Sequence, residues 1–320
     1  MIKNAITYSV EMPTGFEMLE FATKSEFFED TADGEGKLVE LYTANKPRTA
    51  QLSTIGFAKH PLMGKYVAPF NGGYCLTILK WEKKIDNGAV NARVKEIVAE
   101  IEKQGRTVKR KERTVMKDQI IGELLPLILP TPKYTFAYYH TESKTLIVDT
   151  TSDKTSDEVT SLLRKCIGSL KATTRYVDPR IGLTEQVANC LDEGEQFIIH
   201  PVNSIHPVSI GNKLELAGGD TNGNLKFKDV DLFDETTAAE AIGQIREGGM
   251  YVKSVELEYV HNAVTFQLNN GAKIKGLQFD AFEADGEDTQ ADWQSESFYA
   301  VKIVADISKS IVDHFTVVEE

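Results

Sequence analysis

The sequence of 320 residues predicts a mixed α+β fold, because strand-like runs alternate with segments of helical periodicity. Residues 74–81 form a run of β-type residues, and the apolar positions change to a helical spacing soon after it. In the second half several strand-like runs follow one another, and Asn269-Asn270-Gly271 is a strong hairpin signal between two of them. Apolar residues make up 41% of the chain, which is enough for a sizeable core.

The first half of the chain predicts strands around one helical insertion. Thr14 is expected to cap a helix over residues 15–29, and Ser156 is expected to cap another helix that ends at Leu170. Two prolines and three glycines predict a loop over residues 59–73, and the turn residues 141–144 predict a β-hairpin. Strands are expected at residues 5–10, 38–43, 50–57, 74–81, 133–140 and 145–151.

The insertion itself, residues 84–125, predicts a helical hairpin. Its first helix has one apolar face and is broken at Gly105. Its second helix is expected over about residues 111–125 and ends at Pro126. The apolar positions are Val90, Val94, Ile97, Val98 and Ile101 in the first helix, and Val115, Met116, Ile120, Ile121, Leu124 and Leu125 in the second.

The second half predicts a smaller α+β region after a linker at residues 173–179. Helices are expected at residues 184–191, 236–247 and 292–314, and Gly248-Gly249 end the second of them. Strands are expected at residues 196–201, 213–216, 224–228, 251–259, 263–269 and 273–280.

Composition limits the class of protein. No apolar run approaches the roughly 18 residues that a membrane-spanning helix needs, and the N-terminus lacks the apolar core of a signal peptide. The cysteines Cys75, Cys166 and Cys190 are far apart and odd in number, so they predict neither a disulfide framework nor a zinc site. These features predict a protein of the reducing cytoplasm that does not contact membranes.

A basic segment within an acidic chain is the most informative feature of the sequence. The chain has a formal net charge of −12, whereas residues 80–117 hold twelve Lys/Arg and six Asp/Glu and are therefore +6, which leaves −18 elsewhere. This reversal of sign concentrates a positive potential where one polyanion could bind, and nucleic acid is the first candidate. The alternative is a solvated helical hairpin with many surface lysines.

The spacing of these cations suits phosphate binding. Lys109, Arg113 and Lys117 are four residues apart, so on a helix they form one stripe, which Arg106 and Arg110 can extend. A stripe of cations contacts phosphates without reading bases. No aromatic residues are interleaved with it, so we expect sequence-independent binding of duplex DNA rather than stacking on single strands.

Nothing in the sequence specifies an active site. The six histidines lie in no metal-binding motif, and neither a phosphate-binding glycine loop nor a nucleophile elbow occurs. Asp229 and Asp231 could bind Mg²⁺ as in a metal-dependent nuclease, whereas a solvated or turn role is the alternative. We therefore expect no catalytic residue, no metal site and no cofactor.

Three local strings carry a resemblance to a known family. They are KxExKI at 80–85, KRKER at 109–113 followed by LLP at 124–126, and LIVD at 146–149 followed by LLRKCIGSL at 162–170. With the order of the predicted elements, they resemble the RdgC family of bacterial recombination-associated proteins. The resemblance covers about residues 74–280, and its third string is the most specific.

This resemblance implies a horseshoe-shaped subunit with centre, tip and base regions. Two subunits would close into a ring through tip–tip and base–base contacts, with duplex DNA in a basic central hole. It also implies sequence-independent DNA binding that restrains RecA-type homologous recombination indirectly, through the DNA, and no catalytic activity. On this pattern residues 1–83 and 127–175 form the centre, 84–126 the tip, and 176–320 the base.

Two departures from the family pattern predict a distant member. The family has an aromatic residue shortly after the LLP string, whereas Leu127-Ile128-Leu129 follow here, so the tip contact would be aliphatic. A Lys-Lys-Gln-Asp-Leu loop of the family's base region reads KDVDL in this chain, at residues 228–232.

An alternative function is a protein-interaction module whose acidic surface mimics DNA.

The sequence and the resemblance together predict two sets of site residues, for a nucleoid-associated protein of the cytoplasm that binds duplex DNA and a second copy of itself. The DNA-binding set is Lys80, Lys84, Arg106, Lys109, Arg110, Lys111, Arg113, Lys117 and Lys228, and the dimer-contact set is Leu124, Leu125, Leu127, Ile128 and Leu129.

Overall fold

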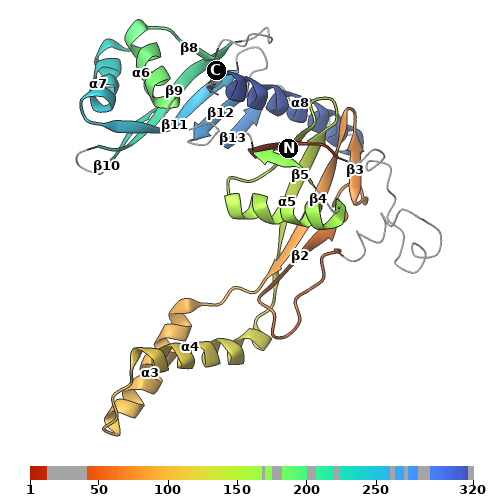
Figure 1. The fold of residues 1–320 in the computed structure, drawn as a ribbon, viewed down its shortest axis with the longest axis vertical. Coiled ribbons are helices and arrows are strands. Elements are labelled where there is room, and N and C mark those ends of the chain that lie inside the picture. Colours follow the sequence, from red (N-terminus) through yellow and green to blue (C-terminus); the bar gives the residue numbers. More distant parts are fainter. Residues whose placement is uncertain are drawn as a thin grey trace, which may run out of the picture. The chain divides into compact units, whose positions relative to one another are not determined.

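The computed structural model describes residues 1–12, 42–167, 170–174, 182–199, 207–219, 223–259, 264–269, 273–279 and 289–315. Over these ranges the fold is mixed α+β, with an antiparallel sheet and six α-helices, as the sequence predicts (Figure 1). The chain divides into two compact units. We call residues 21–59 and 77–135 the hairpin unit, and residues 1–20, 60–76 and 136–320 the sheet unit. The division into centre, tip and base stays a prediction.

In the hairpin unit, a helical insertion connects two long strands. The strand β2 (Ser53–Ala58) pairs antiparallel with β4 (Gly73–Glu82), and β4 leads into α3 (Asn87–Lys103). Asp86 caps α3, because its carboxylate accepts hydrogen bonds from the backbone of Gly88 at 2.8 Å and of Ala89 at 3.2 Å. The helix α4 (Arg110–Leu124), the 3₁₀ turn η2 (Leu125–Leu127) and β5 (Thr131–His140) follow, which confirms the predicted hairpin between strands.

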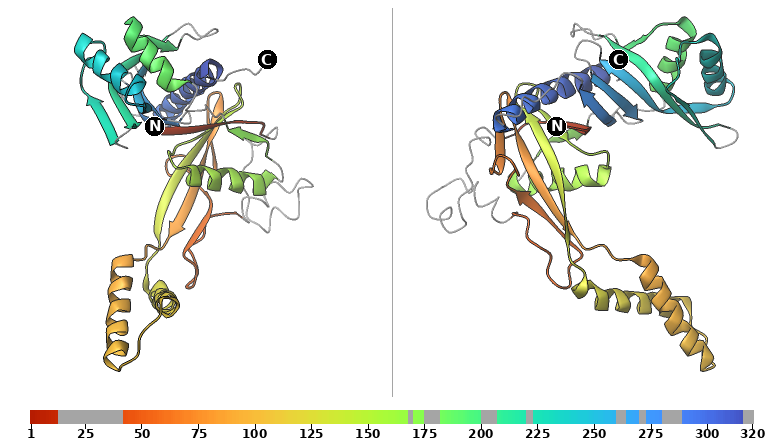
Figure 2. Two further views of the ribbon diagram at one scale, coloured as in Figure 1. Left: turned by 60° about the vertical axis from the view of Figure 1, so that its left-hand side comes forward. Right: turned by 180° about the vertical axis from the view of Figure 1, so that it is seen from behind.

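The two helices pack through most of the predicted apolar positions, but Val115 of α4 is 65% exposed, so this position of the prediction was wrong. Val90 and Val98 of α3 and Ile120 of α4 are buried, and Val94 and Ile97 are half-buried. The axes of α3 and α4 cross steeply, as the two views in Figure 2 show. Gly105, in the connection between them, has the positive φ of 81° that favours glycine.

In the sheet unit, an antiparallel sheet carries the remaining described strands in the order β10-β9-β11-β12-β13-β1-β6-β5. Two short strands lie beside this path, because β8 pairs with β9 and β7 with β1. A third short strand, β3, pairs with the first residues of β4, which belong to this unit. The strands are β1 (Asn4–Val10), β3 (Val67–Phe70), β6 (Thr145–Val148), β7 (Ala172–Thr174), β8 (Phe197–Ile199), β9 (Val208–Gly218), β10 (Gly223–Lys228), β11 (Met250–Tyr259), β12 (Val264–Asn269) and β13 (Lys273–Phe279).

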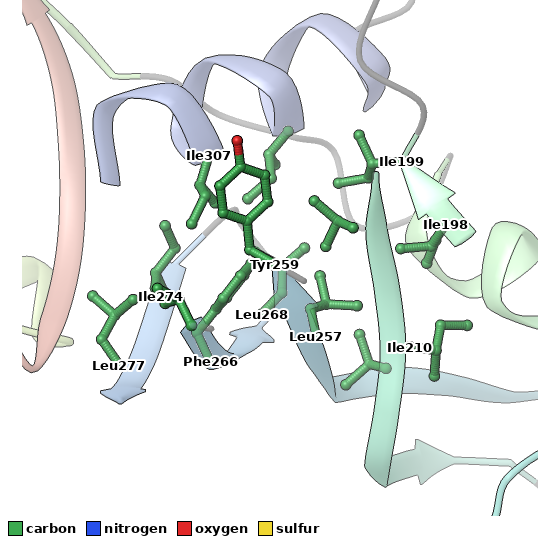
Figure 3. Packing of buried hydrophobic residues seen from close by; sticks show 14 of the residues in the cluster. Ile198, Ile199, Ile210, Leu257, Tyr259, Phe266, Leu268, Ile274, Leu277 and Ile307 are labelled. Atoms are coloured by element: carbon green, nitrogen blue, oxygen red, sulfur yellow. The ribbon is translucent and has the colours of Figure 1, made fainter. Parts of the chain in front are cut away.

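Four helices complete the sheet unit: α5 (Asp153–Ile167), α6 (Leu183–Glu193), α7 (Glu235–Arg246) and α8 (Thr289–Phe315). Figure 3 shows the core near α8, where Ile307 packs over Tyr259 and Phe266. Burying each such aliphatic or aromatic side chain stabilises the fold by about 1.5–3 kcal/mol. The C-terminal helix is therefore an integral part of this unit. No described helix is long and apolar enough to cross a membrane.

Three expectations change in the structure. The predicted loop at 59–73 contains β3, because Val67, Ala68 and Phe70 are buried and Gly72, with a φ of 81°, makes the turn to β4. Part of the predicted linker at 173–179 belongs to β7, which pairs with β1. The predicted helix at 15–29 and most of the predicted strand at 38–43 lie outside the described residues.

Ser156 is not the cap of α5. The helix begins three residues earlier, and the backbone N–H of Thr155 donates to Oγ of Ser152 at 3.3 Å. Ser156 is buried instead, and its hydroxyl shares a hydrogen bond of 2.6 Å with the hydroxyl of Tyr8 on β1. The prediction was wrong because both serines suit a cap by composition, and only burial distinguishes them.

Candidate nucleic-acid interface

The hairpin unit gathers more positive charge than the basic segment alone. Its described residues, 42–59 and 77–135, hold sixteen Lys/Arg and eight Asp/Glu, a net +8. The loop before β2 adds Lys46 and Arg48, which sequence reasoning missed. Nζ of Lys46 lies over the ring of Trp81 on β4, 5.4 Å from its centroid. The signal that could have found these cations is the lack of any acidic residue in 42–59.

Three consecutive cations stand at the start of α4. Lys109, Arg110 and Lys111 are exposed and form no ion pair within the described part of the chain. We call them the α4 cations. The first turn of a helix also presents unpaired backbone N–H groups and the positive end of the helix dipole, so this end of α4 favours anions.

Glu112 holds the start of α4 together. Its carboxylate accepts a hydrogen bond from the backbone N–H of Lys109 at 3.1 Å and pairs with the guanidinium of Arg106 at 2.7 Å. The hydrogen bond from Lys109 and the one from Arg106 lower the pKa of this carboxyl. Glu112 therefore stays ionised at neutral pH and engages Arg106.

The predicted stripe of Lys109, Arg113 and Lys117 follows the flank of α4 next to α3. Arg113 pairs with Glu102 of α3 at 3.3 Å, and Lys117 is half-buried. Exposed ion pairs of this kind stabilise a protein by only about 0–1 kcal/mol, so a phosphate can compete for Arg106 and Arg113. The cations that are already available to an anion are the α4 cations.

Lys80, Lys83 and Lys84 lie at the end of β4 and have different surroundings. Lys80 is half-buried opposite Ile55 of β2, and Lys84 is exposed. Lys83 is buried, and its ammonium group donates to backbone carbonyls. Of these three lysines, only Lys84 is exposed and can contact a ligand without rearrangement.

The predicted dimer-contact residues lie where α4 returns to β5. The side chains of Leu127 and Leu129 are 77% and 84% exposed, whereas Leu124 and Ile128 are half-buried. Leu125 is only 7% exposed, so it packs within the hairpin unit and does not present its side chain to another copy. Two large apolar side chains this exposed are unusual for a free surface.

Four lysines on β9, β10 and β11 of the sheet unit lie beside carboxylates. Lys226 and Lys253 share Glu215 at 3.3 and 2.9 Å, and Lys213 pairs with Glu256 at 2.5 Å. Lys228, the predicted DNA contact of the base, lies 3.7 Å from the carboxylate of the adjacent Asp229. We call Lys213, Lys226, Lys228 and Lys253 the sheet lysines.

The candidate Mg²⁺ ligands of the sheet unit form a turn. Asp229 has a positive φ of 55°, and the carboxylate of Asp231 accepts a hydrogen bond from the backbone of Phe233 at 2.9 Å. Asp234 then caps α7 through the backbone N–H of Thr237. In the ranges that the structure describes, no three His, Cys, Asp or Glu side chains gather as metal ligands.

Comparison with known proteins gives a match over nearly the whole chain. Residues 3–313 match the family described as "Putative exonuclease, RdgC". The recombination-associated protein RdgC of Tolumonas auensis is 32% identical over 272 residues, which cover 82% of this chain and 83% of that protein. Its namesake from Haemophilus influenzae strain Rd is 24% identical over 322 residues, which cover 98% and 97%.

Proposed function

The chain belongs to the RdgC family of recombination-associated proteins, and from this premise we propose that it binds duplex DNA without sequence preference. It does so as a ring-shaped homodimer associated with the nucleoid, and it restrains RecA-type recombination by occupying the duplex. The observation that carries the proposal is the group of α4 cations, Lys109, Arg110 and Lys111, exposed and without an ion pair in the described chain.

The chemistry of these cations favours phosphates over bases. Lysine and arginine side chains at a helix start contact phosphate oxygens, which are the same in every sequence. No aromatic side chain stands among the α4 cations to stack on an unpaired base. Outside residues 80–117 the chain is strongly acidic, so repulsion confines a polyanion to this part of the surface.

The ring requires a second copy, and the exposed Leu127 and Leu129 support one. They lie beyond the C-terminal end of α4, whereas the α4 cations lie at its N-terminal end. A helix of 15 residues at about 1.5 Å per residue separates the two ends by roughly 20 Å. One end can therefore join the copies while the other contacts DNA, and each horseshoe-shaped subunit supplies half of the ring.

The test is a mobility shift with two labelled duplexes of unrelated sequence, with and without Mg²⁺, beside ultracentrifugation of the free protein. We expect both duplexes to shift equally and remain intact, and the protein to sediment as a dimer at micromolar concentration. Cleavage in Mg²⁺ would support the exonuclease of the family description instead. A protein that shifts neither duplex would fit a DNA mimic.

The dimer contact can be tested separately. Changing Leu127 and Leu129 to Asp places charges in the proposed tip contact, so we expect the dimer dissociation constant to rise by about tenfold or more, with unchanged circular dichroism. Val230→Asp is the matched control, because Val230 is an exposed apolar residue of the sheet unit, and it should leave the dimer intact. A double variant whose dimer dissociation constant equals that of the wild type would exclude this segment from the contact.

A further inference from the structure

Lys83 carries the one buried charge among the lysines, arginines, aspartates and glutamates that the structure describes. Its side chain is 5% exposed. No carboxylate of the described ranges compensates its ammonium group. Instead Nζ donates to three backbone carbonyls, those of Thr49 at 3.0 Å, Leu125 at 3.0 Å and Arg48 at 3.4 Å. An ammonium group has three N–H donors, and each has an acceptor here.

These hydrogen bonds join three segments that are distant in sequence. Lys83 follows β4, Arg48 and Thr49 belong to the loop before β2, and Leu125 begins the turn after α4. The backbone N–H of Lys83 also donates to the carbonyl of Leu52 at 2.8 Å. Burying an ammonium group is costly unless all its donors are satisfied, so the segments are held in one arrangement.

Both segments that Lys83 holds present exposed leucines. Leu52, at the end of the loop, is 51% exposed. The exposed Leu127 and Leu129 lie two and four residues after Leu125. We propose that Lys83 is the positioning residue of a self-association surface that includes Leu52 as well as Leu127 and Leu129, and whose occupant is a second copy of this chain. This inference rests on the homodimer of the proposed function and adds Leu52 and Lys83 to it.

The charges around this surface suit a second copy. The exposed charged residues within three residues of Thr49, Lys83 or Leu125 in the sequence include the cations Arg48 and Lys84 and the acids Asp86 and Glu123. A contact between two copies related by a two-fold axis pairs the same patch with itself, and a rim with both signs of charge can then be self-complementary. A uniformly basic or acidic partner would meet like charges on this rim.

The experiment compares Lys83→Met with Lys95→Met, which changes an exposed lysine of α3 in the same way. The dimer dissociation constant is measured by sedimentation. Lys83→Met leaves three carbonyls without their donor, so we expect this constant to rise by about tenfold or more, and by less than about threefold in Lys95→Met. Lys83→Arg keeps the charge and the donors, and it should recover part of the affinity.

Hydrogen exchange separates positioning from general destabilisation. In Lys83→Met we expect faster exchange at the amides of residues 49–52 and 125–129, with β11 and β12 unchanged. Faster exchange throughout both units would assign Lys83 a merely structural role and overturn the inference.

If Lys83→Met does not fold, Leu52→Asp still tests the proposed surface, because Leu52 is half-exposed and its substitution leaves the core unchanged. It should weaken the dimer as Leu127→Asp does. Unchanged dimerisation in Leu52→Asp or in Lys83→Met overturns this inference alone. A wild-type chain that is monomeric at every concentration overturns the proposed homodimer itself.

Discussion

The α4 cations of the hairpin unit and the sheet lysines differ in what surrounds them. Lys109, Arg110 and Lys111 have no ion pair within the described chain, whereas each sheet lysine lies within 3.7 Å of a carboxylate. Both surfaces carry lysine or arginine side chains, but they differ in how easily a phosphate can approach these cations. A phosphate can approach the α4 cations directly, but at the sheet lysines it must displace or approach a carboxylate.

Secondary structure produces this difference. On adjacent antiparallel strands, residues directly opposite are close, and Lys226 of β10 faces Glu215 of β9 in the register. At the start of a helix, the side chains of consecutive residues point in different directions. Lys109, Arg110 and Lys111 therefore cannot all form an ion pair with the same carboxylate. Net charge alone does not distinguish a compensated lysine from an available one.

The largest expected effect comes from reversing two α4 cations. Changing Arg110 and Lys111 to Glu should lower duplex affinity by at least about tenfold at low salt, with dimerisation and fold retained. The matched control is Lys302→Glu with Lys309→Glu, since both lysines are exposed on α8 of the sheet unit. Fluorescence anisotropy with a labelled duplex measures both. Equal losses in the two variants would break the comparison.

A smaller effect is expected for the cations that already have partners. Changing Arg106 and Arg113 to Gln should lower affinity by about two- to threefold, and by less than the same change at Arg110 and Lys111. The reason is that Glu112 and Glu102 already engage the two arginines. The reverse order of losses would mean that DNA selects the stripe beside α3.

Removing the carboxylates that pair with the sheet lysines should raise duplex affinity rather than lower it. Glu215→Gln with Glu256→Gln leaves Lys213, Lys226 and Lys253 without their ion pairs. We expect duplex affinity to rise by only about twofold, because the change makes the whole chain less negative without adding a contact at the α4 cations. A rise of tenfold would assign the main DNA contact to the sheet lysines.

The smallest effect concerns mild acid and acts on the sheet unit. Burial lowers the pKa of His60, whose Nδ1 accepts hydrogen bonds from the backbone of Leu62 and Met63. As the pH falls below the usual pKa of about 6.5, the unfolded chain takes up this proton first, so the stability present above that pH is progressively lost.

His60→Asn keeps an acceptor and cannot titrate. Between pH 7 and 5 its melting temperature should fall by about 1–3 °C less than that of the wild type. Duplex affinity at pH 6 should be the same in both, because His60 belongs to the sheet unit and is not one of the proposed DNA contacts. A larger loss of duplex affinity in one of them would connect His60 to the interface.

Much of the fold follows from local sequence patterns. The helices α4, α6, α7 and α8 lie within a few residues of their predicted bounds, because apolar periodicity and, for α4 and α7, a proline or glycine stop mark them. β3 could not be predicted, because prolines and glycines in 59–73 conceal the buried Val67, Ala68 and Phe70. In that strand tertiary burial overrides local propensity.

The site could be predicted only in part. Charge counting identified the basic segment, since like charges close in sequence remain close on a helix. It could not show that Lys83 is buried, that Leu125 faces inward, or that Glu102 engages Arg113, because each depends on an interaction between distant segments. Pairing in three dimensions decides which cations remain available.

The salt dependence of duplex binding tests the central claim most directly, because its slope reports how many phosphates the protein neutralises. For the wild type, the logarithm of the association constant against the logarithm of salt concentration should have a slope of roughly −4 to −7. In Arg110→Glu with Lys111→Glu the slope should flatten by about one for each phosphate that the variant no longer binds, equally for two unrelated sequences. A slope that stays the same in this variant, or is near zero in the wild type, would contradict phosphate binding by the α4 cations.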